Sequence, residues 1–300
     1  MRVTERAGRS VLQLFLLLFC WQQAVADPSD RALFWAIESE QGHAGHLLGT
    51  IHSEDPRVLD FSEPFLDALR RNSHFAMELV PNLPTLAALT VAMQLPPETD
   101  LAALVGDRRF EAVTQALTRY GIPRGKVARM KPWAAMMTLS VPPPETGFFM
   151  DFSLSLRASG EGLKVIGLET LDEQLQFLED MPLRHQLSLL DLALAEADQV
   201  QIVHDRMVEI YLTGDLHALL EETEEQLSAL EEESRQLFLT QGIVARNVRM
   251  LERLLEGLSE GTVFVAVGAL HLPGEEGLIA LLRSKGYRLT PMPSPFRVEP

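Results

Sequence analysis

The chain has 300 residues, 46% of them hydrophobic, and its formal net charge at pH 7 is −16. A chain of this length can bury a self-sufficient core, and its apolar content excludes an intrinsically disordered protein. The excess of acidic side chains repels phosphate backbones, so we do not expect nucleic acid as a partner. The single cysteine is Cys20, and we expect the segment that contains it to be removed.

The N-terminal segment has the layout of a cleavable signal peptide. Arg2, Arg6 and Arg9 form a basic start, an apolar run follows, and Ala24-Val25-Ala26 supplies the small residues of a cleavage site. The apolar run is much shorter than the roughly 20 residues of a membrane-spanning helix. We therefore predict a signal peptide at residues 1–26 and export to the periplasm or the exterior after cleavage near Ala26; the alternative is an uncleaved membrane anchor. No later segment is apolar enough to predict a transmembrane helix.

The mature chain, residues 27–300, is predicted to form one domain. Short apolar segments predict strands at Ala32–Ile37, His46–Ile51, Phe75–Val80, Leu163–Leu168, Thr262–Val267 and about 287–290. The polar segment Glu40–Gly45 predicts the turn of a first hairpin. Apolar residues at helical spacing predict helices at about 63–71, over most of 83–140, at 151–159, over 171–258 and at about 275–285. This order predicts an α/β or α+β fold, with a mixed sheet and long helical insertions.

Two segments share the pattern apolar-Gly-x-x-His. Gly49–His52 and Gly268–His271 each place a histidine at or just beyond the C-terminal end of a predicted strand. Ligands of open α/β sheets bind outside those strand ends, so the two histidines could converge on one point. Imidazole suits zinc, manganese, iron or cobalt. The other six histidines have no such context, and we expect them at the surface or in loops: His43, His46, His74, His185, His204 and His217.

Two carboxylates occupy the corresponding places on other strands. Glu78 lies inside the apolar segment Phe75–Val80, and Glu169 directly follows the predicted strand Leu163–Leu168. A carboxylate in such a place is costly unless it is paired or bound to a metal. With the histidines, these residues would form an open metal site or an acid/base site without metal. The alternative is a pair of hydrogen-bonded core histidines and two carboxylates that cap adjacent helices.

The order of several motifs resembles the TraB/GumN family, also called TraB/PrgY/GumN. The resembling segments are Gly49–His52, Met77–Leu79, Lys131–Trp133, Gly147–Leu154 with Asp151, Gly167–Thr170 with Gln174, Tyr211–Asp215, Arg246-Asn247 and Val267–Gly274. Together they cover nearly the whole mature chain. One departure is Val248–Met250, because the family often has an aromatic residue a few positions after its Arg-Asn pair.

This family is similar to the Tiki proteins, metal-dependent proteases that lack the His-Glu-x-x-His helix, as does this sequence. The resemblance implies an erythromycin-esterase/ChaN-like architecture and a divalent metal ion such as zinc, manganese or cobalt. It implies a catalytic centre of His52, Glu78, Glu169 and His271. Within this centre we expect His52, Glu78 and His271 to hold the metal and Glu169 to deprotonate the attacking water, although the two glutamates could exchange roles.

The expected substrate-binding residues are Asp151, Arg246 and Asn247. Arg246 could stabilise a developing oxyanion or hold a substrate carboxylate, or it could form a buried ion pair with an acid such as Asp151. For Asn247 we favour a structural hydrogen bond.

The leading hypothesis is an exported metal-dependent hydrolase, a peptidase by resemblance, that acts on peptide or protein substrates. One alternative is a non-catalytic peptide- or heme/metal-binding protein of the envelope. Another is an esterase-type hydrolase without metal that uses His and Glu as acid and base.

Overall fold

The computed structural model describes residues 31–297, so the predicted signal peptide at 1–26 lies outside the described residues. Its centre is a six-stranded sheet of order β4-β3-β5-β2-β1-β6. The strands are β1 Phe34–Ser39, β2 Gly42–Thr50, β3 His74–Met77, β4 Lys164–Gly167, β5 Val263–Gly268 and β6 Arg288–Pro291. β4, β3, β5 and β2 are parallel, whereas β1 and β6 pair antiparallel. This confirms the predicted mixed sheet.

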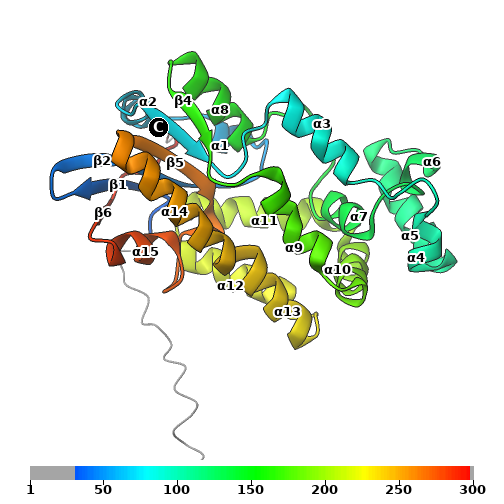
Figure 1. The fold of residues 1–300 in the computed structure, drawn as a ribbon. Helices are drawn as coiled ribbons and strands as arrows, with labels where there is room; N and C mark the ends of the chain where they lie inside the picture. The colour runs from blue at the N-terminus through cyan, green and yellow to red at the C-terminus, as the bar shows by residue number, and fades with distance from the viewer. Residues whose placement is uncertain (1–30, 298–300) are drawn as a thin grey trace, which may run out of the picture.

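Helices make up most of the remaining chain. They are α1 Pro56–Leu59, α2 Glu63–Arg70, α3 Leu83–Ala92, α4 Leu101–Val105, α5 Asp107–Leu117, α6 Arg124–Val127, α7 Pro132–Leu139, α8 Met150–Gly160, α9 Leu171–Asp180, α10 Leu183–Glu196, α11 Val200–Thr213, α12 Leu216–Leu227, α13 Glu232–Leu239, α14 Ala245–Glu260 and α15 Leu278–Ser284. Figure 1 shows the sheet on one side of the molecule and α4–α7 and α10 on the other. Each side has its own hydrophobic cluster, the first around Phe75 and Phe264 and the second around Leu117 and Trp133.

Local sequence signals account for the helices that carry the site. α9 begins with a capping box, in which Thr170 and Glu173 satisfy each other's backbone N–H groups. α14 buries Asn247, Met250, Leu251 and Leu254, a spacing of three and four residues that gives one apolar stripe facing the core. A π-helical turn, Thr240–Val244, precedes α14 directly.

Several predicted boundaries were wrong, those of β2 and β3 most clearly. The first hairpin turns at Glu40-Gln41, and β2 already begins at Gly42, where Glu40–Gly45 had been expected as a turn. Gly42 has φ 113°, which closes this shorter turn because glycine tolerates positive φ. β3 ends at Met77 rather than at Val80. Glu78 therefore lies just beyond the strand end instead of inside an apolar strand.

Two histidines expected at the surface or in loops are buried: His46 and His185. The His46 ring stacks on Phe34 at a centroid distance of 5.5 Å and contacts Phe264 at 5.8 Å. Burial lowers the pKa of His46 to about 4, the charges of His43 and Arg71 add to this effect, and the hydrogen bond from Asn72 opposes it. His185 lies in the helical side, where its Nδ1 is 2.7 Å from the Ser234 hydroxyl.

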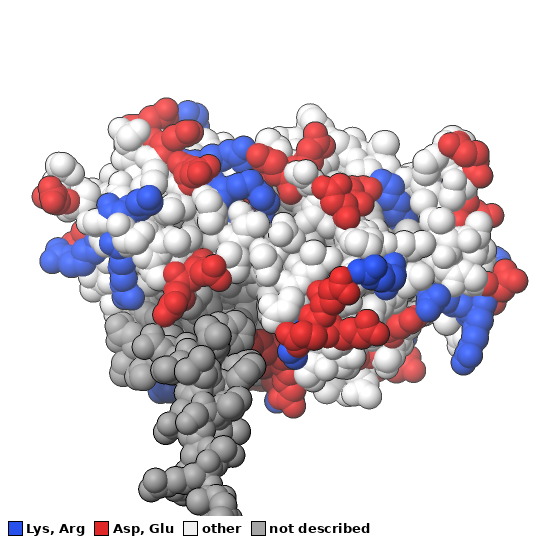
Figure 2. Space-filling model, turned by 60° about the horizontal axis from the view of Figure 1, so that its bottom comes forward, with Lys and Arg blue, Asp and Glu red and all other residues white. Residues whose placement is uncertain are grey.

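On the face shown in Figure 2, acidic and basic side chains are interspersed over the described residues. Within residues 31–297, no helix combines the length and the apolar character needed to cross a bilayer.

Candidate active site

The carboxyl ends of the four parallel strands bring the predicted residues to one edge of the sheet. Glu78 follows β3, Glu169 comes two residues after β4, and His271 ends a 3₁₀ turn directly after β5. Backbone hydrogen bonds continue the pairing beyond the strands, since the Glu169 N–H donates to the Glu78 carbonyl at 2.9 Å. His52 lies two residues after β2. The parallel order therefore places all four residues at the expected ligand-binding edge.

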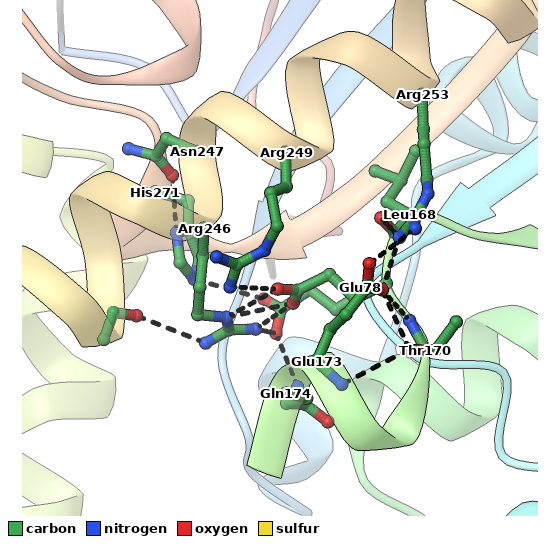
Figure 3. Close-up of polar contacts among 12 residues, drawn as sticks. Glu78, Leu168, Thr170, Glu173, Gln174, Arg246, Asn247, Arg249, Arg253 and His271 are labelled. Atoms are coloured by element: carbon green, nitrogen blue, oxygen red, sulfur yellow. Dashed lines mark hydrogen bonds and ion pairs between the residues drawn. The ribbon is translucent and has the colours of Figure 1, made fainter. Parts of the chain in front are cut away.

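Arg246 clamps the two glutamates. Its Nη2 lies 2.5 Å from Oε2 of Glu78 and 2.5 Å from Oε2 of Glu169, and its Nε donates to both oxygens of Glu169 at 2.9 and 3.1 Å (Figure 3). Arg249 adds a second cation 3.5 Å from Glu169, whose side chain has 0% exposure. The buried ion pair considered for Arg246 thus exists, but with these glutamates instead of Asp151.

Glu78 is held ionised by groups on three sides. Its Oε1 accepts a hydrogen bond from the Gly268 backbone N–H at 2.8 Å, and Gln174 donates to Oε2 at 3.3 Å. Burial alone would raise the pKa of Glu78, but the charges of His271 and Arg246 and the Gly268 N–H outweigh it and lower the pKa to about 2. Glu78 is therefore a carboxylate at neutral pH.

Asn247 determines which nitrogen of His271 carries the proton. The Asn247 amide donates to the Glu276 carbonyl at 2.7 Å, which leaves Oδ1 facing Nδ1 of His271 at 2.6 Å. An amide oxygen can only accept, so this network assigns the proton to Nδ1. Burial lowers the pKa of His271 to about 4, with Glu78 opposing and Arg246 adding to the effect. A neutral imidazole therefore directs its unprotonated Nε2 toward Oε1 of Glu78, at 3.6 Å.

A cavity of about 340 Å³ opens next to Glu78. Its polar lining includes His52, Glu78, Asp151 and Gln174, and its apolar lining comes from Met77, Leu79, Pro81, Leu89 and Phe152. The glutamate that stays buried, Glu169, does not line it. Of the two glutamates, Glu78 is the one that a molecule in this cavity would meet.

His52 belongs to the cavity wall, where it is 59% exposed. Its ring stacks on Phe149 at a centroid distance of 3.9 Å, and its Nδ1 lies 3.8 Å from Oδ2 of Asp151. The other oxygen of Asp151 accepts a 2.6 Å hydrogen bond from Thr50. Asp151 thus lies beside His52 and lines the cavity, and its role in binding substrate stays a prediction.

Two of the three predicted metal ligands, His271 and Glu78, lie in positions that fit a metal ion. His271 Nε2 and Glu78 Oε1 are a neutral imidazole nitrogen and a carboxylate oxygen, the donors that zinc accepts. His52 is not part of such a cluster, because the part of the chain that the structure describes has no group of three or more His, Cys, Asp or Glu side chains arranged to hold a metal. The complete set of His52, Glu78 and His271 stays a prediction.

Sequence reasoning missed two aromatic residues of the site. Phe149, which stacks on His52, and Phe152, which lines the cavity, flank Asp151 in the segment singled out for that acid alone. The signal was the aromatic pair Phe148-Phe149 after a proline-rich loop, since exposed aromatic residues beside a polar motif are typical of binding surfaces.

Comparisons with known proteins give two matches. The model of the TraB/PrgY/gumN family matches residues 33–291. A protein of Nematostella vectensis described as "Metalloprotease TIKI homolog" is 29% identical over 161 residues, which cover 46% of this chain and 34% of that protein. The chain thus matches only about a third of that relative's length. No solved structure matches, so the likeness to erythromycin-esterase and ChaN-like architectures stays a prediction.

Proposed function

The chain belongs to the TraB/PrgY/gumN family, and on this premise we propose that it is an exported, metal-dependent hydrolase of peptide bonds. The observation that supports this best is the 3.6 Å approach of His271 Nε2 to Glu78 Oε1 beside an open cavity. Both atoms are hydrogen-bond acceptors, so nothing in the pair itself joins them. A cation between them would relieve this arrangement. Similarity to a protein described as a metalloprotease homologue agrees with the assignment.

In this proposal, His271 and Glu78 hold a divalent ion and His52 completes the set. Such an ion, when bound, lowers the pKa of water and polarises a carbonyl. Asn247 keeps the proton of His271 on Nδ1 and so leaves Nε2 available. Residues that hydrogen-bond to a metal ligand, as Asn247 does to His271, orient that ligand and influence the properties of the bound metal.

Arg246 and Glu169 have a positioning role in the same proposal. Glu169 has no exposed side-chain surface and is enclosed by Arg246 and Arg249, so we assign it to holding Arg246 rather than to deprotonating water. Arg246 in turn fixes Oε2 of Glu78, and Gly268 and Gln174 fix the carboxylate further. With Oε2 held in this way, Oε1 of Glu78 would be the oxygen that holds a bound ion and accepts a proton from water. Asp151 orients His52 and meets the substrate.

Export is part of the proposal. It rests on the sequence of residues 1–26, in which a basic start, an apolar run and small residues follow one another as in a signal peptide. A periplasmic or secreted location suits a mature chain without cysteine, since oxidising conditions would not affect it.

The test is a paired measurement of bound metal and of peptide-library hydrolysis. We expect the purified protein to contain about one ion, and His52→Ala and His271→Ala to lose both metal and activity. His217→Ala is the matched control, because His217 is a surface histidine on α12 paired with Glu221. If the His52 and His271 variants match the control in both measurements, the proposal fails. Metal or peptide binding without any hydrolysis would favour a binding protein instead.

A further inference from the structure

Helix α3 is apolar on all sides, yet it buries none of its residues. Leu83 is 82% exposed, Val91 is 72% exposed and Leu86 is also exposed. A helix that is hydrophobic all round is normally buried in a core. Continuous apolar surface that stays exposed marks a site of interaction.

The surrounding sequence makes this surface uncharged as well as apolar. No Asp, Glu, Lys or Arg occurs from Leu79 to Pro97, although 23% of all residues are charged. The helix is nonetheless well defined, because Asn82 caps it by accepting a hydrogen bond from the Thr85 N–H at 3.0 Å. Figure 1 shows α3 between α8 and the helices α5–α7 in this view.

α3 is continuous with the cavity of the candidate active site. The chain runs from Glu78 through Leu79 and Pro81, which line the cavity, into the helix, and Leu89 of the helix lines the cavity again. Leu89, Leu86 and Leu83 are three residues apart, so they are neighbours along one side of the helix. An apolar stripe therefore begins inside the cavity and leads out of it onto exposed surface.

A second apolar element borders the cavity at the N-terminal end of α8. Phe152 lines the cavity, and its ring lies 5.5 Å from that of Phe148, which is exposed. An exposed aromatic ring against a cavity-lining ring repeats the arrangement seen at Leu86 and Leu89. The cavity is thus flanked by apolar side chains from α3 and from the segment that carries Asp151.

We propose that the stripe Leu83, Leu86 and Leu89, together with Phe148 and Phe152, is the docking surface for an extended peptide with apolar side chains. One apolar side chain of that peptide enters the cavity beside Glu78, and its neighbours lie along α3. This inference rests on the proposed function, and it names the substrate class: apolar peptide segments rather than acidic or strongly polar ones.

The continuity with the cavity favours a peptide over a membrane or a second copy of the chain. Glu78 and Asp151 place two carboxylates at the cavity end of the stripe, and the 79–97 segment offers no basic residue, so an anionic lipid surface would be repelled. The stripe narrows into a cavity of about 340 Å³. Such a space admits single side chains but not the helix of a second molecule.

The experiment uses eight-residue peptides that are identical except for one position, occupied by Leu, Phe, Ser or Asp. Their cleavage and the binding of fluorescein-labelled versions are measured with the full mature protein. We expect the wild type to prefer Leu or Phe over Ser by roughly 10-fold or more, the usual discrimination of an apolar pocket. Leu86→Glu should remove most of this preference, because binding and cleavage of the Leu and Phe peptides fall toward those of the Ser peptide.

Ile202→Glu is the matched control, because Ile202 is also an exposed apolar residue of a helix, on α11. It should keep the full preference. Equal preference in Leu86→Glu and the wild type would overturn the docking surface, as would a dimer or binding to phosphatidylglycerol vesicles that Leu86→Glu abolishes without altering peptide selection. Apolar preference in binding without any cleavage would overturn the proposed function alone. Cleavage without apolar preference would overturn this inference alone.

Discussion

The amide oxygen of Asn247 lies 2.6 Å from Nδ1 of His271, and this contact decides what the other ring nitrogen can do. With the proton on Nδ1, Nε2 presents a lone pair to Oε1 of Glu78. Without Asn247 the ring could carry its proton on Nε2 and donate a hydrogen bond to the carboxylate. That alternative would satisfy both groups and close the gap in which the proposed ion binds.

Replacing Asn247 with Leu should therefore reduce metal affinity and hydrolysis by roughly 10- to 100-fold, the usual effect of losing an outer partner. Asn247→Asp keeps an acceptor for Nδ1 and should retain more of the activity. ¹⁵N spectra of the imidazole would report the tautomer directly. If Asn247→Leu keeps the proton on Nδ1 and full activity, Asn247 has no positioning role.

The two glutamates should respond differently to replacement by Gln. Glu169→Gln leaves Arg246 buried with less counter-charge and should destabilise the fold by about 3 kcal/mol, the lower range for a broken buried pair. Glu78→Gln keeps more solvent contact, and it should instead reduce turnover by roughly 10²-fold or more. Urea unfolding and peptide hydrolysis separate the effects. A stable but inactive Glu169→Gln variant would show that Glu169 acts on the substrate or the water.

The convergence of strand ends could be predicted from sequence, because it depends on local patterns. Each Gly-x-x-His segment follows an apolar strand, and parallel strands bring their carboxyl ends to one edge. The pairing of Arg246 with Glu78 could not be predicted, since 168 residues separate them. Where α14 lies over that edge is decided by the packing of its apolar stripe, and a local pattern does not specify the partner of an arginine.

The burial of His46 was missed for a different reason. His46 is the first residue of the predicted strand His46–Ile51, directly after the polar segment Glu40–Gly45 that was expected as a turn, so it resembled a residue at the exposed end of a strand. β2, however, is flanked by β5 and β1 in the middle of the sheet, and all its residues from Ala44 to Thr50 are buried. A central strand covered on both faces encloses even its polar side chains.

Export predicts a defined N-terminus. Protein recovered from the periplasm or the medium of its native host should begin at Asp27, because Ala24-Val25-Ala26 provides the small residues that the cleavage reaction needs. Ala26→Phe should leave a precursor with a larger mass. N-terminal sequencing and intact mass spectrometry measure both. Recovery of intact Met1 from a cytosolic fraction would contradict the prediction.

His46 should make the folded state sensitive to mild acid. Its pKa is about 4 in the folded protein, against an ordinary value of 6.5, so between these pH values the unfolded chain binds more protons and stability falls as pH falls. Between pH 7 and pH 5 the cost from this residue is about 2 kcal/mol. His46→Phe keeps a ring between Phe34 and Phe264 and should lose less stability over that interval than the wild type, whereas the surface variant His217→Gln should behave like the wild type. Urea unfolding at pH 7, 6 and 5 gives the free energy of unfolding of each of the three proteins as a function of pH. If the curves of the wild type and His46→Phe are parallel, the buried imidazole does not cause the acid sensitivity.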